Sequence, residues 1–278
     1  MSPGEPIIVF SDLDGTLLDE NYSFAAAQPA LRKMAESAIP LILCSSKTRK
    51  EIEHYRDKME NFHPFISENG GGIFIPEGYF PDETVLERFS PSSEMGYRVI
   101  RLGTPYCELR KALAELRSEG FPITGFGDLS TAELAKQTGL STREALLCKE
   151  RDFDEPFLFK GSDEEKAKLF HAIRDRGLFT TQGVYLHLLG DNDKGKAVKI
   201  LTVIFRARYG SLRTVALGDS PNDLPMLESA DIPLAVQRPD GRHHPSLSLP
   251  NLDKVEGVGP HGWNSAMLAL LARLGAVS

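Results

Sequence analysis

Residues 7–16 read IIVFSDLDGT and place two aspartates, Asp12 and Asp14, directly after a short apolar run. The run is rich in β-branched residues and is bounded by Pro6 and an Asp-Gly pair, which is typical of a strand buried on both faces. Side chains two residues apart in an extended segment point the same way, so both carboxylates can address one reacting centre at the strand's end. Two such carboxylates repel each other unless a cation or a shared proton compensates, so the stretch predicts a metal site.

The rest of the chain repeats the strand-then-helix pattern around this stretch. Residues 40–44 (PLILC) and 214–217 (TVAL) resemble buried strands, and residues 24–37 carry apolar side chains at helical spacing with Ser23 as a candidate N-cap. Between them, residues 105–119 and 163–175 indicate amphipathic helices, while residues 157–159 and 184–189 indicate strands. The fold class predicted is α/β: a parallel-sheet core (residues 1–83 and 191–278) interrupted by an inserted α+β unit (residues 84–190).

Composition excludes several other classes of protein. The 278 residues are 41% hydrophobic and 26% charged, which argues against disorder as the main state. The net charge of −7 disfavours binding to nucleic acid or to anionic membranes. No window approaches the length of an apolar bilayer span, and three cysteines without CxxC spacing fit neither a disulfide framework nor a structural zinc site. We therefore expect a cytoplasmic protein with no nucleic-acid or membrane partner.

A second acidic loop, residues 218–223 (GDSPND), follows the strand-like residues 214–217. Ligands of parallel α/β sheets collect outside the carboxyl ends of the strands, so this loop and residues 12–14 can meet although they are far apart in sequence. Hard carboxylate oxygens suit Mg²⁺, which takes only a few ligands from the protein. Asp219 and Asp223 thus become metal-ligand candidates, and Mg²⁺ is the predicted cofactor.

Two further residues fit contacts with a phosphoryl group. Ser45 follows the strand-like residues 40–44 and precedes a helix-like stretch, so its hydroxyl and the helix-terminal N–H groups converge where an anion can bind. Lys194 begins another helix-like stretch and can bring positive charge beside an aspartate nucleophile and a transferring phosphate. Attack by a carboxylate on phosphorus would form an aspartyl-phosphate.

Taken in order, DLDGT, Ser45, Lys194 and GDSPND resemble the four motifs of the haloacid dehalogenase (HAD) superfamily of phosphotransferases. The resemblance implies a Rossmann-like core, Asp12 as nucleophile and Asp14 as general acid and base. It also implies Mg²⁺ bound by Asp12, by the Asp14 backbone carbonyl and by Asp219, with Asp223 supporting or completing that coordination. The long insertion between the second and third motifs is similar to a C2-type cap, which selects the substrate in such enzymes.

Within that superfamily the chain resembles the mannosyl-3-phosphoglycerate phosphatase family. The segments that carry this resemblance are residues 44–49 (CSSKTR), 67–71 (SENGG), 138–140 (TGL), 151–157 (RDFDEPF), 187–190 (HLLG) and 192–197 (NDKGKA). One stretch departs from the pattern, because residues 182–185 (QGVY) stand where a Gly-Gly-Arg-like stretch is expected.

The family resemblance implies a Mg²⁺-dependent phosphomonoesterase with a phosphorylated sugar or a glycosyl-phosphoglycerate as substrate. Lys47 and Arg151 are candidates for contact with a carboxylate, and Glu68, Asn69 and His187 for contact with a sugar. The full set of candidate substrate-binding residues is Ser46, Lys47, Glu68, Asn69, Arg151, His187 and Asn222. A phosphomannomutase-like phosphomutase, another sugar-phosphate phosphatase and a non-catalytic sugar-phosphate-binding protein remain alternatives. The sequence leaves open the choice between mannosyl and glucosyl head groups, and it does not indicate an oligomeric state.

Overall fold

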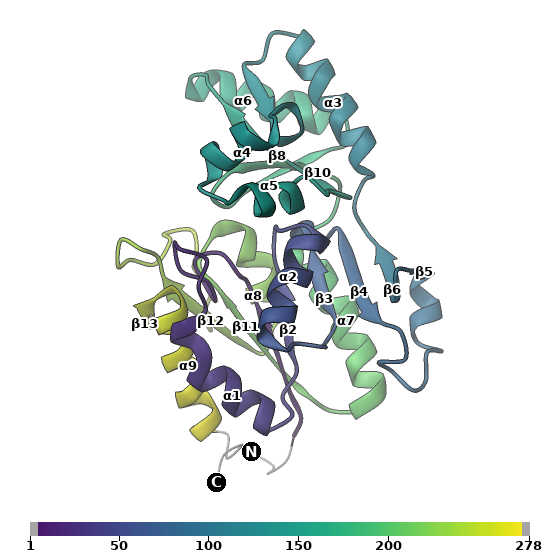
Figure 1. The fold of residues 1–278 in the computed structure, drawn as a ribbon, viewed down its shortest axis with the longest axis vertical. Coiled ribbons are helices and arrows are strands. Elements are labelled where there is room, and N and C mark those ends of the chain that lie inside the picture. The colour runs from purple at the N-terminus through teal and green to yellow at the C-terminus, as the bar shows by residue number, and fades with distance from the viewer. Residues whose placement is uncertain (1–4, 274–278) are drawn as a thin grey trace.

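Strand β1 (Ile7–Ser11) lies in the middle of a nine-stranded sheet in the computed structural model, which describes residues 5–273 (Figure 1). The strand order is β13-β12-β11-β1-β2-β3-β4-β6-β5, parallel from β13 to β3 and antiparallel beyond it. The other strands of this sheet are β2 (Leu41–Cys44), β3 (Phe65–Ser67), β4 (Gly72–Pro76), β5 (Ser92–Glu94), β6 (Tyr97–Arg101), β11 (Arg213–Gly218), β12 (Ile232–Gln237) and β13 (Asp253–Val258).

The direction in which the sheet is wound reverses at β1. Strands β2 and β3 follow on one side of β1, whereas β11, β12 and β13 lie on the other side. Open α/β sheets bind ligands at such a switch point, in the crevice outside the carboxyl ends of the strands. Ser11 pairs with Leu217, so the residues that follow β1 and β11 leave the sheet side by side.

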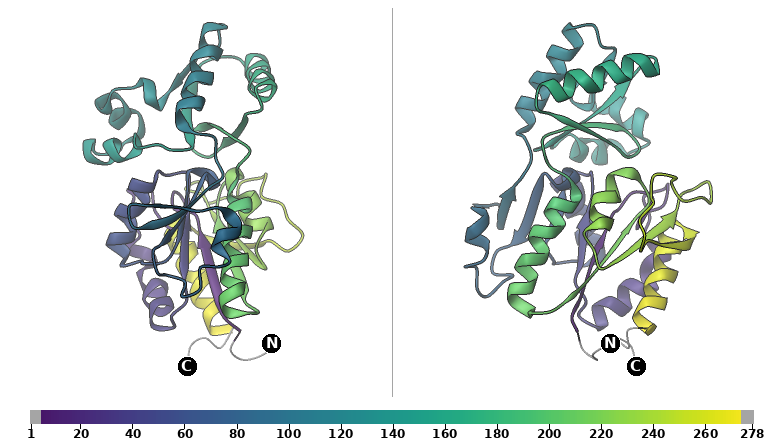
Figure 2. Two further views of the ribbon diagram at one scale, coloured as in Figure 1. Left: turned by 90° about the vertical axis from the view of Figure 1, so that its right-hand side faces the viewer. Right: turned by 180° about the vertical axis from the view of Figure 1, so that it is seen from behind.

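Alternation along β1 explains the two apolar cores of the large unit. Ile7 and Val9 pack with helices α1, α2 and α9 on one face of the sheet, whereas Ile8 and Phe10 pack with α7 and α8 on the other. Figure 2 shows helices covering both faces. The helices and 3-10 turns of this unit are η1 (Ala25–Ala27), α1 (Gln28–Glu36), α2 (Arg49–Met59), η2 (Glu68–Gly70), η3 (Leu86–Phe89), α7 (Lys194–Tyr209), η5 (Pro221–Asp223), α8 (Leu224–Glu228) and α9 (Gly259–Arg273).

A smaller unit stands over the carboxyl ends of the parallel strands (Figures 1 and 2). Its antiparallel sheet has the order β7-β8-β10-β9, with α3 and α6 packed on one face and α4 and α5 in a separate apolar cluster. The elements are α3 (Tyr106–Ser118), β7 (Ile123–Gly125), η4 (Phe126–Asp128), α4 (Thr131–Thr138), α5 (Thr142–Cys148), β8 (Asp154–Phe159), α6 (Asp163–Asp175), β9 (Phe179–Gln182) and β10 (Leu186–Leu189). The predicted fold class, a parallel α/β core with an inserted α+β unit, is confirmed.

Two local expectations differ from the structure. Strands β5 and β6 fall within residues 84–190 but belong to the large sheet, where β6 pairs with β4 and β5 with β6, because Val99 and Ile100 pack into its two cores. The strand pairing therefore favours a boundary between the large and the smaller unit nearer residue 102 than residue 84. The helix expected over residues 24–37 begins only at Gln28, with Pro29 in its first turn, because proline lacks the N–H that an earlier start would use there. Ser23 accordingly does not cap it.

Within residues 5–273, none of the helices has the length and apolar character needed to cross a lipid bilayer. The three cysteines are free, with Cys44 and Cys148 buried and Cys107 exposed.

Candidate active site

Asp12 and Lys194 form a buried ion pair at the switch point of the large sheet. Asp12 follows β1, and its backbone N–H donates to the Leu217 carbonyl at 3.0 Å, which holds it beside β11. Lys194 is the first residue of α7, and its ammonium lies 2.6 Å from both Asp12 Oδ1 and Asp223 Oδ1. Burial alone would lower the pKa of Lys194, but the two carboxylates outweigh it and raise that pKa. The lysine is therefore a permanent cation beside Asp12.

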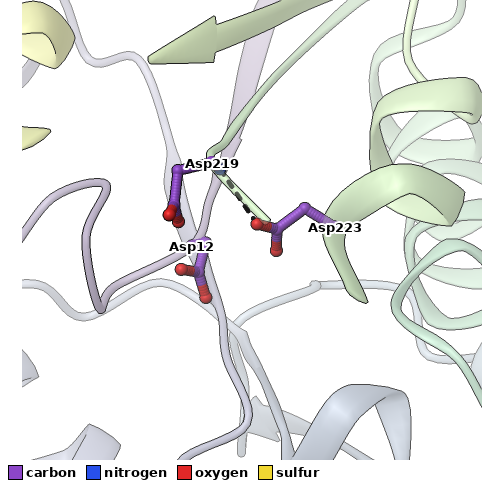
Figure 3. Close-up of side chains that lie close together, drawn as sticks. All are labelled: Asp12, Asp219 and Asp223. Carbon is purple, nitrogen blue, oxygen red and sulfur yellow. Dashed lines mark hydrogen bonds between the residues drawn. The ribbon is translucent and has the colours of Figure 1, made fainter. Parts of the chain in front are cut away.

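Asp12, Asp219 and Asp223 form an acidic cluster. One carboxylate oxygen of each lies within 4.8 Å of the others, and Figure 3 shows the three side chains gathered where β1 and β11 end. Burial and the neighbouring carboxylates raise the pKa of Asp12, and they raise the pKa of Asp219 to about 7. Since Lys194 supplies a single positive charge to three buried acids, the cluster suits a divalent cation. The donors are hard oxygens, as Mg²⁺ requires.

The two oxygens of Asp223 are already occupied by donors of the protein. Oδ1 accepts from Lys194, and Oδ2 accepts from the backbone N–H groups of Asp219 and Ser220, each at 3.0 Å. Asp219 itself accepts a 3.1 Å hydrogen bond from the Thr16 hydroxyl. Asp223 therefore shapes the loop that presents Asp219, while Asp12 and Asp219 line the open cavity.

Asp14 lies at the cavity wall beside Lys47. The Lys47 ammonium is 3.0 Å from Asp14 Oδ1 and 3.7 Å from Glu51 Oε1, and it lies 4.9 Å from the centroid of the Tyr22 ring. The Asp14 side chain keeps 29% exposure, whereas Lys47 is almost fully buried. Asp14 can thus exchange a proton with a molecule in the cavity, and Lys47 is already compensated by two carboxylates.

The loop after β2 and the turn η2 are joined by backbone hydrogen bonds. The Glu68 N–H donates to the Lys47 carbonyl and the Asn69 N–H to the Ser45 carbonyl, both at 3.0 Å. Ser45 Oγ accepts from the Lys47 N–H at 3.2 Å, which leaves its O–H proton to donate. Gly70 follows with a φ of 85°, and a Cβ there would lie 2.1 Å from the Asp193 carbonyl oxygen, so only glycine fits beside the start of α7.

A cavity of about 650 Å³ separates the acidic cluster from the smaller unit. Its wall combines residues of both units, and among the predicted site residues it includes Asp12, Asp14, Ser46, Lys47, Arg151, His187, Asp219 and Asn222. Ser45, Glu68, Asn69, Lys194 and Asp223 lie behind this lining. The structure therefore brings residues from the ends of several strands and from the inserted unit around one space.

Arg151 is a buried cation with weak protein contacts. Its Nη1 lies 3.5 Å from the Ser46 carbonyl oxygen and 4.0 Å from Asp154 Oδ1, its Nη2 lies 3.7 Å from Cys148 Sγ, and its buried Nε has no hydrogen-bond partner. A guanidinium that is 9% exposed and lines a cavity is expected to form short, charge-assisted bonds. The arrangement suits an anionic group of a ligand.

Glu68 and Asn69 point toward the backbone and buried groups of the smaller unit. The Glu68 carboxylate accepts from the Asp152 and Phe153 N–H groups, the latter at 2.8 Å, and burial raises the pKa of Glu68 to about 8. The Asn69 amide donates to Asp154 Oδ2 at 2.7 Å. These contacts join the two units and direct both side chains away from the space in which a sugar contact was expected.

Several cavity residues were not identified from the sequence. The residues concerned are Tyr22, Tyr185, Arg238 and His244. Arg238 directly follows β12, at the same sheet edge as Asp12 and Asp219, and this position is the signal that could have revealed it. Tyr22 also crosses to the smaller unit, where its hydroxyl donates to the Thr138 carbonyl at 3.3 Å.

The chain belongs to the haloacid dehalogenase-like hydrolase family, whose model matches residues 9–90 and 144–240. Both matched segments contain predicted motifs, with Asp12, Asp14 and Ser45 in the first and Lys194 and Asp219 in the second. The superfamily resemblance drawn from the sequence is thereby confirmed.

Curated relatives of this chain carry more particular names. It is 49% identical to a glucosyl-3-phosphoglycerate/mannosyl-3-phosphoglycerate phosphatase from Methanococcoides burtonii over 96% of this chain and 97% of the relative. It is 38% identical to a protein of the same name from Persephonella marina, over 95% and 97% of the two chains. A mannosyl-3-phosphoglycerate phosphatase from Pyrococcus furiosus is 35% identical over 89% of this chain and 97% of the relative. The resemblance to this phosphatase family is confirmed as well.

Solved structures share the fold at low sequence identity. A phosphatase of the HAD superfamily from Bacteroides thetaiotaomicron aligns with a TM-score of 0.67 at 18% identity, covering 100% of this chain and 99% of that chain. A HAD subclass IIB sugar phosphatase aligns with a TM-score of 0.62 at 15% identity, covering 97% and 99% of the two chains. The arrangement of the two units is therefore a recurrent one.

Proposed function

We propose that this protein is a Mg²⁺-dependent phosphomonoesterase that hydrolyses 2-O-mannosyl-3-phosphoglycerate to mannosylglycerate and phosphate. The observation that carries the proposal is the cavity itself. Its lining includes Asp12 and Asp14 of the large unit, as phosphoryl transfer to a carboxylate requires, and Arg151 of the smaller unit, an under-partnered cation suited to a carboxylate. The names of the curated relatives support the same substrate class.

The acidic cluster is the proposed site of Mg²⁺. Asp12 and Asp219 would provide side-chain oxygens and Asp14 its backbone carbonyl, while Asp223 holds the Asp219 loop and Lys194. When bound, the ion supplies positive charge that offsets the phosphoryl oxygens as Asp12 approaches phosphorus. The Lys194 ammonium compensates the Asp12 carboxylate, and the Ser45 hydroxyl is the proposed donor to a phosphoryl oxygen.

The proposed reaction has two displacements at phosphorus. In the first, an Asp12 carboxylate oxygen bonds to phosphorus, the ester bond to the glycerate oxygen breaks, and protonated Asp14 gives its proton to that oxygen. In the second, the Asp14 carboxylate takes a proton from water, whose oxygen bonds to phosphorus while the bond to Asp12 breaks. Phosphate leaves and both aspartates return to their initial states. The exposure of Asp14 to the cavity suits both proton transfers.

The smaller unit is the proposed cap that selects the substrate. Arg151 would bind the glycerate carboxylate, and His187, which lines the same cavity, would contact a sugar hydroxyl. Lys47, Ser46 and Asn222 border the phosphoryl end. Enclosure of the bound ester under this unit would exclude bulk water during the first displacement. The cytoplasm is the compartment that the sequence predicts for this activity.

The test is a comparison of kcat/KM for mannosyl- and glucosyl-3-phosphoglycerate, mannose 6-phosphate and 3-phosphoglycerate in the presence of Mg²⁺. We expect a glycosyl-phosphoglycerate to be the best substrate, with inorganic phosphate and the free glycosylglycerate as products. A higher kcat/KM for mannose 6-phosphate contradicts the substrate assignment. Return of the phosphoryl group to sugar would indicate a phosphomutase, and absence of phosphate release from every compound would indicate a binding protein.

The glucosyl epimer is the second candidate substrate, because the relatives from M. burtonii and P. marina are named for both head groups. The two substrates differ at one sugar hydroxyl, so the ratio of their kcat/KM values measures how strictly the cap reads that position.

A further inference from the structure

His187 and Asp154 form a buried pair in the cap sheet. Asp154 begins β8 and His187 lies in β10, where Leu189 pairs with Asp154 and Pro156 pairs with His187, so the two side chains are diagonal neighbours on one face. His187 Nδ1 is 2.9 Å from both oxygens of Asp154. Both residues are at least 96% buried, and only His187 lines the cavity.

A chain of hydrogen bonds runs from the loop of residues 218–223 to the Asp154 carboxylate. The Ser220 hydroxyl lies 3.0 Å from Asn222 Oδ1, Asn222 Nδ2 donates to Asn69 Oδ1 at 3.0 Å, and Asn69 Nδ2 donates to Asp154 Oδ2 at 2.7 Å. A carboxylate only accepts, so Asn69 must turn its amide NH₂ toward Asp154 and its oxygen toward Asn222. Every link therefore points its donor toward Asp154.

This arrangement determines what His187 can present to the cavity. With Asn69 donating to the carboxylate from one side, the remaining lone pairs of Asp154 call for a donor on His187 as well, which must then be Nδ1–H. In the neutral ring Nε2 is left with a lone pair and no hydrogen, as an acceptor for a hydroxyl group.

We propose that Asp154 is a positioning residue that holds the His187 ring in its Nδ1–H tautomer, so that Nε2 accepts a hydrogen bond from a sugar hydroxyl of the substrate. This inference rests on the proposed function, because it assigns Nε2 to the glycosyl part of that substrate. Asp154 is not part of the cavity lining, so it reaches the sugar through the ring, and its Oδ1 also lies 4.0 Å from Arg151 Nη1.

Replacement Asp154→Asn tests the idea by changing one atom. The asparagine side chain of this variant has one acceptor oxygen, and with that oxygen turned to Asn69 its NH₂ faces His187 Nδ1. The NH₂ then replaces the acceptor at the former Oδ1 position, and the oxygen at the former Oδ2 position is shared between Nδ1 and Asn69. This exchange favours a ring that accepts at Nδ1 and carries its proton on Nε2, where it can no longer accept from a sugar hydroxyl. We expect kcat/KM for the glycosyl-phosphoglycerate to fall about tenfold or more relative to that for para-nitrophenyl phosphate, which lacks the sugar.

The direct readout is the tautomer, seen in ¹H–¹⁵N correlations of the imidazole rings at pH 8 without substrate. The chain has seven histidines, and the signals lost in His187→Gln identify the ring concerned. Wild-type protein should show Nδ1–H and Asp154→Asn should show Nε2–H. In a His187→Ala background, Asp154→Asn should change the substrate ratio little, because its effect passes through the missing ring.

Glu155→Gln is the matched control, because Glu155 is a fully buried acid in the same strand that contacts Tyr106 and Arg110. It should leave the His187 tautomer unchanged and affect both substrates equally. An Nε2–H ring or an imidazolium in wild-type protein overturns the inference without any variant, as does an unchanged substrate ratio in folded Asp154→Asn. If wild-type protein hydrolyses no glycosyl-phosphoglycerate, the proposed function fails, whereas the tautomer measurement still decides whether Asp154 controls the ring.

Discussion

Two sides of the cavity differ in how their charges are compensated: the side formed by the large unit, with Asp12, Asp14 and their lysine partners, which we call the floor, and the side formed by the smaller unit, with Arg151, which we call the roof. On the floor, Lys194 lies 2.6 Å from Asp12 and Asp223, and Lys47 lies 3.0 Å from Asp14. On the roof, the contacts of Arg151 are 3.5 Å or longer. The two lysines of the floor already have short contacts with carboxylates before any substrate binds, whereas Arg151 on the roof keeps its charge for an anion from outside. This difference fits the proposed division of roles, in which the large unit carries out the chemistry and Arg151 of the smaller unit selects the substrate.

The largest expected effect comes from replacing Asp12, the proposed nucleophile. Asp12→Asn should lower turnover of every phosphate ester by at least about 10³-fold, because the amide keeps the shape of the side chain but loses its nucleophilic charge. Phosphate release with para-nitrophenyl phosphate and with mannosyl-3-phosphoglycerate measures this, and thermal melting checks the fold. Turnover close to that of wild type in the folded variant would show that another group attacks phosphorus.

Removal of a proposed metal ligand should have the next largest effect. EDTA should stop turnover and Mg²⁺ restore it, while Asp219→Ala should raise the Mg²⁺ concentration needed for half-maximal rate by about 10-fold or more, or abolish the rate. Asp253→Ala is the control, because Asp253 is an exposed acid at the edge of the same sheet. Identical Mg²⁺ titrations of the Asp219 variant and wild type would remove Asp219 from the metal site.

Replacement of Arg151 should affect substrate selection more than it affects the reaction at phosphorus. Arg151→Ala should lower kcat/KM for mannosyl-3-phosphoglycerate about 10- to 100-fold more than for para-nitrophenyl phosphate, because the latter has no carboxylate to bind. Arg110→Ala, which removes a cap arginine that pairs with Glu155 and Asp128 outside the cavity, is the control. Equal losses on both substrates in the Arg151 variant would mean that Arg151 supports the fold or the floor.

The smallest effect on turnover is expected for Glu68, which joins the two units. The free energy of unfolding is the informative measurement for this residue. Burial raises the pKa of Glu68 from 4.5 to about 8, so its contribution to stability is complete below pH 4.5 and is lost as the pH rises through 8. A glutamine at this position keeps an oxygen for the Asp152 and Phe153 N–H groups and cannot ionise. The free energy of unfolding of Glu68→Gln relative to that of wild type should therefore be higher at pH 9 than at pH 5, by on the order of 1–3 kcal/mol.

Urea unfolding at the two pH values measures this difference in the free energy of unfolding. Glu228→Gln, an exposed glutamate on α8, should show no such trend. A pH-independent difference between Glu68→Gln and wild type would mean that Glu68 titrates alike in the folded and unfolded chains.

The floor was more predictable from the sequence than the roof, for a physical reason. Asp12 and Asp219 each follow an apolar strand within a few residues, so local pattern and the rule for parallel sheets suffice to bring them together. The contacts of Glu68 and Asn69 join residues about 85 positions apart, and no local pattern specifies them. The motif resemblance recognised both residues as notable but assigned them to the sugar.

Other differences also trace to non-local packing. The linker-like composition near residues 76–93 concealed β5, which finds its partner only in β6 of the large sheet. Arg238 and His244 reach the cavity from a loop without a recognisable motif. Lys194 was predicted correctly as the start of a helix, but its place between two carboxylates depends on the pairing of strands 206 residues apart in sequence.

Gly70 has a consequence for how this enzyme would respond to random mutation. A side chain there would collide with the carbonyl of Asp193, one residue before Lys194, whose ammonium pairs with Asp12. Most replacements should be tolerated poorly, although the position supplies no reactive atom and binds no ligand. In a saturation screen scored by phosphatase activity, position 70 should therefore rank with Asp12 and Asp219 among the least substitutable sites of the chain.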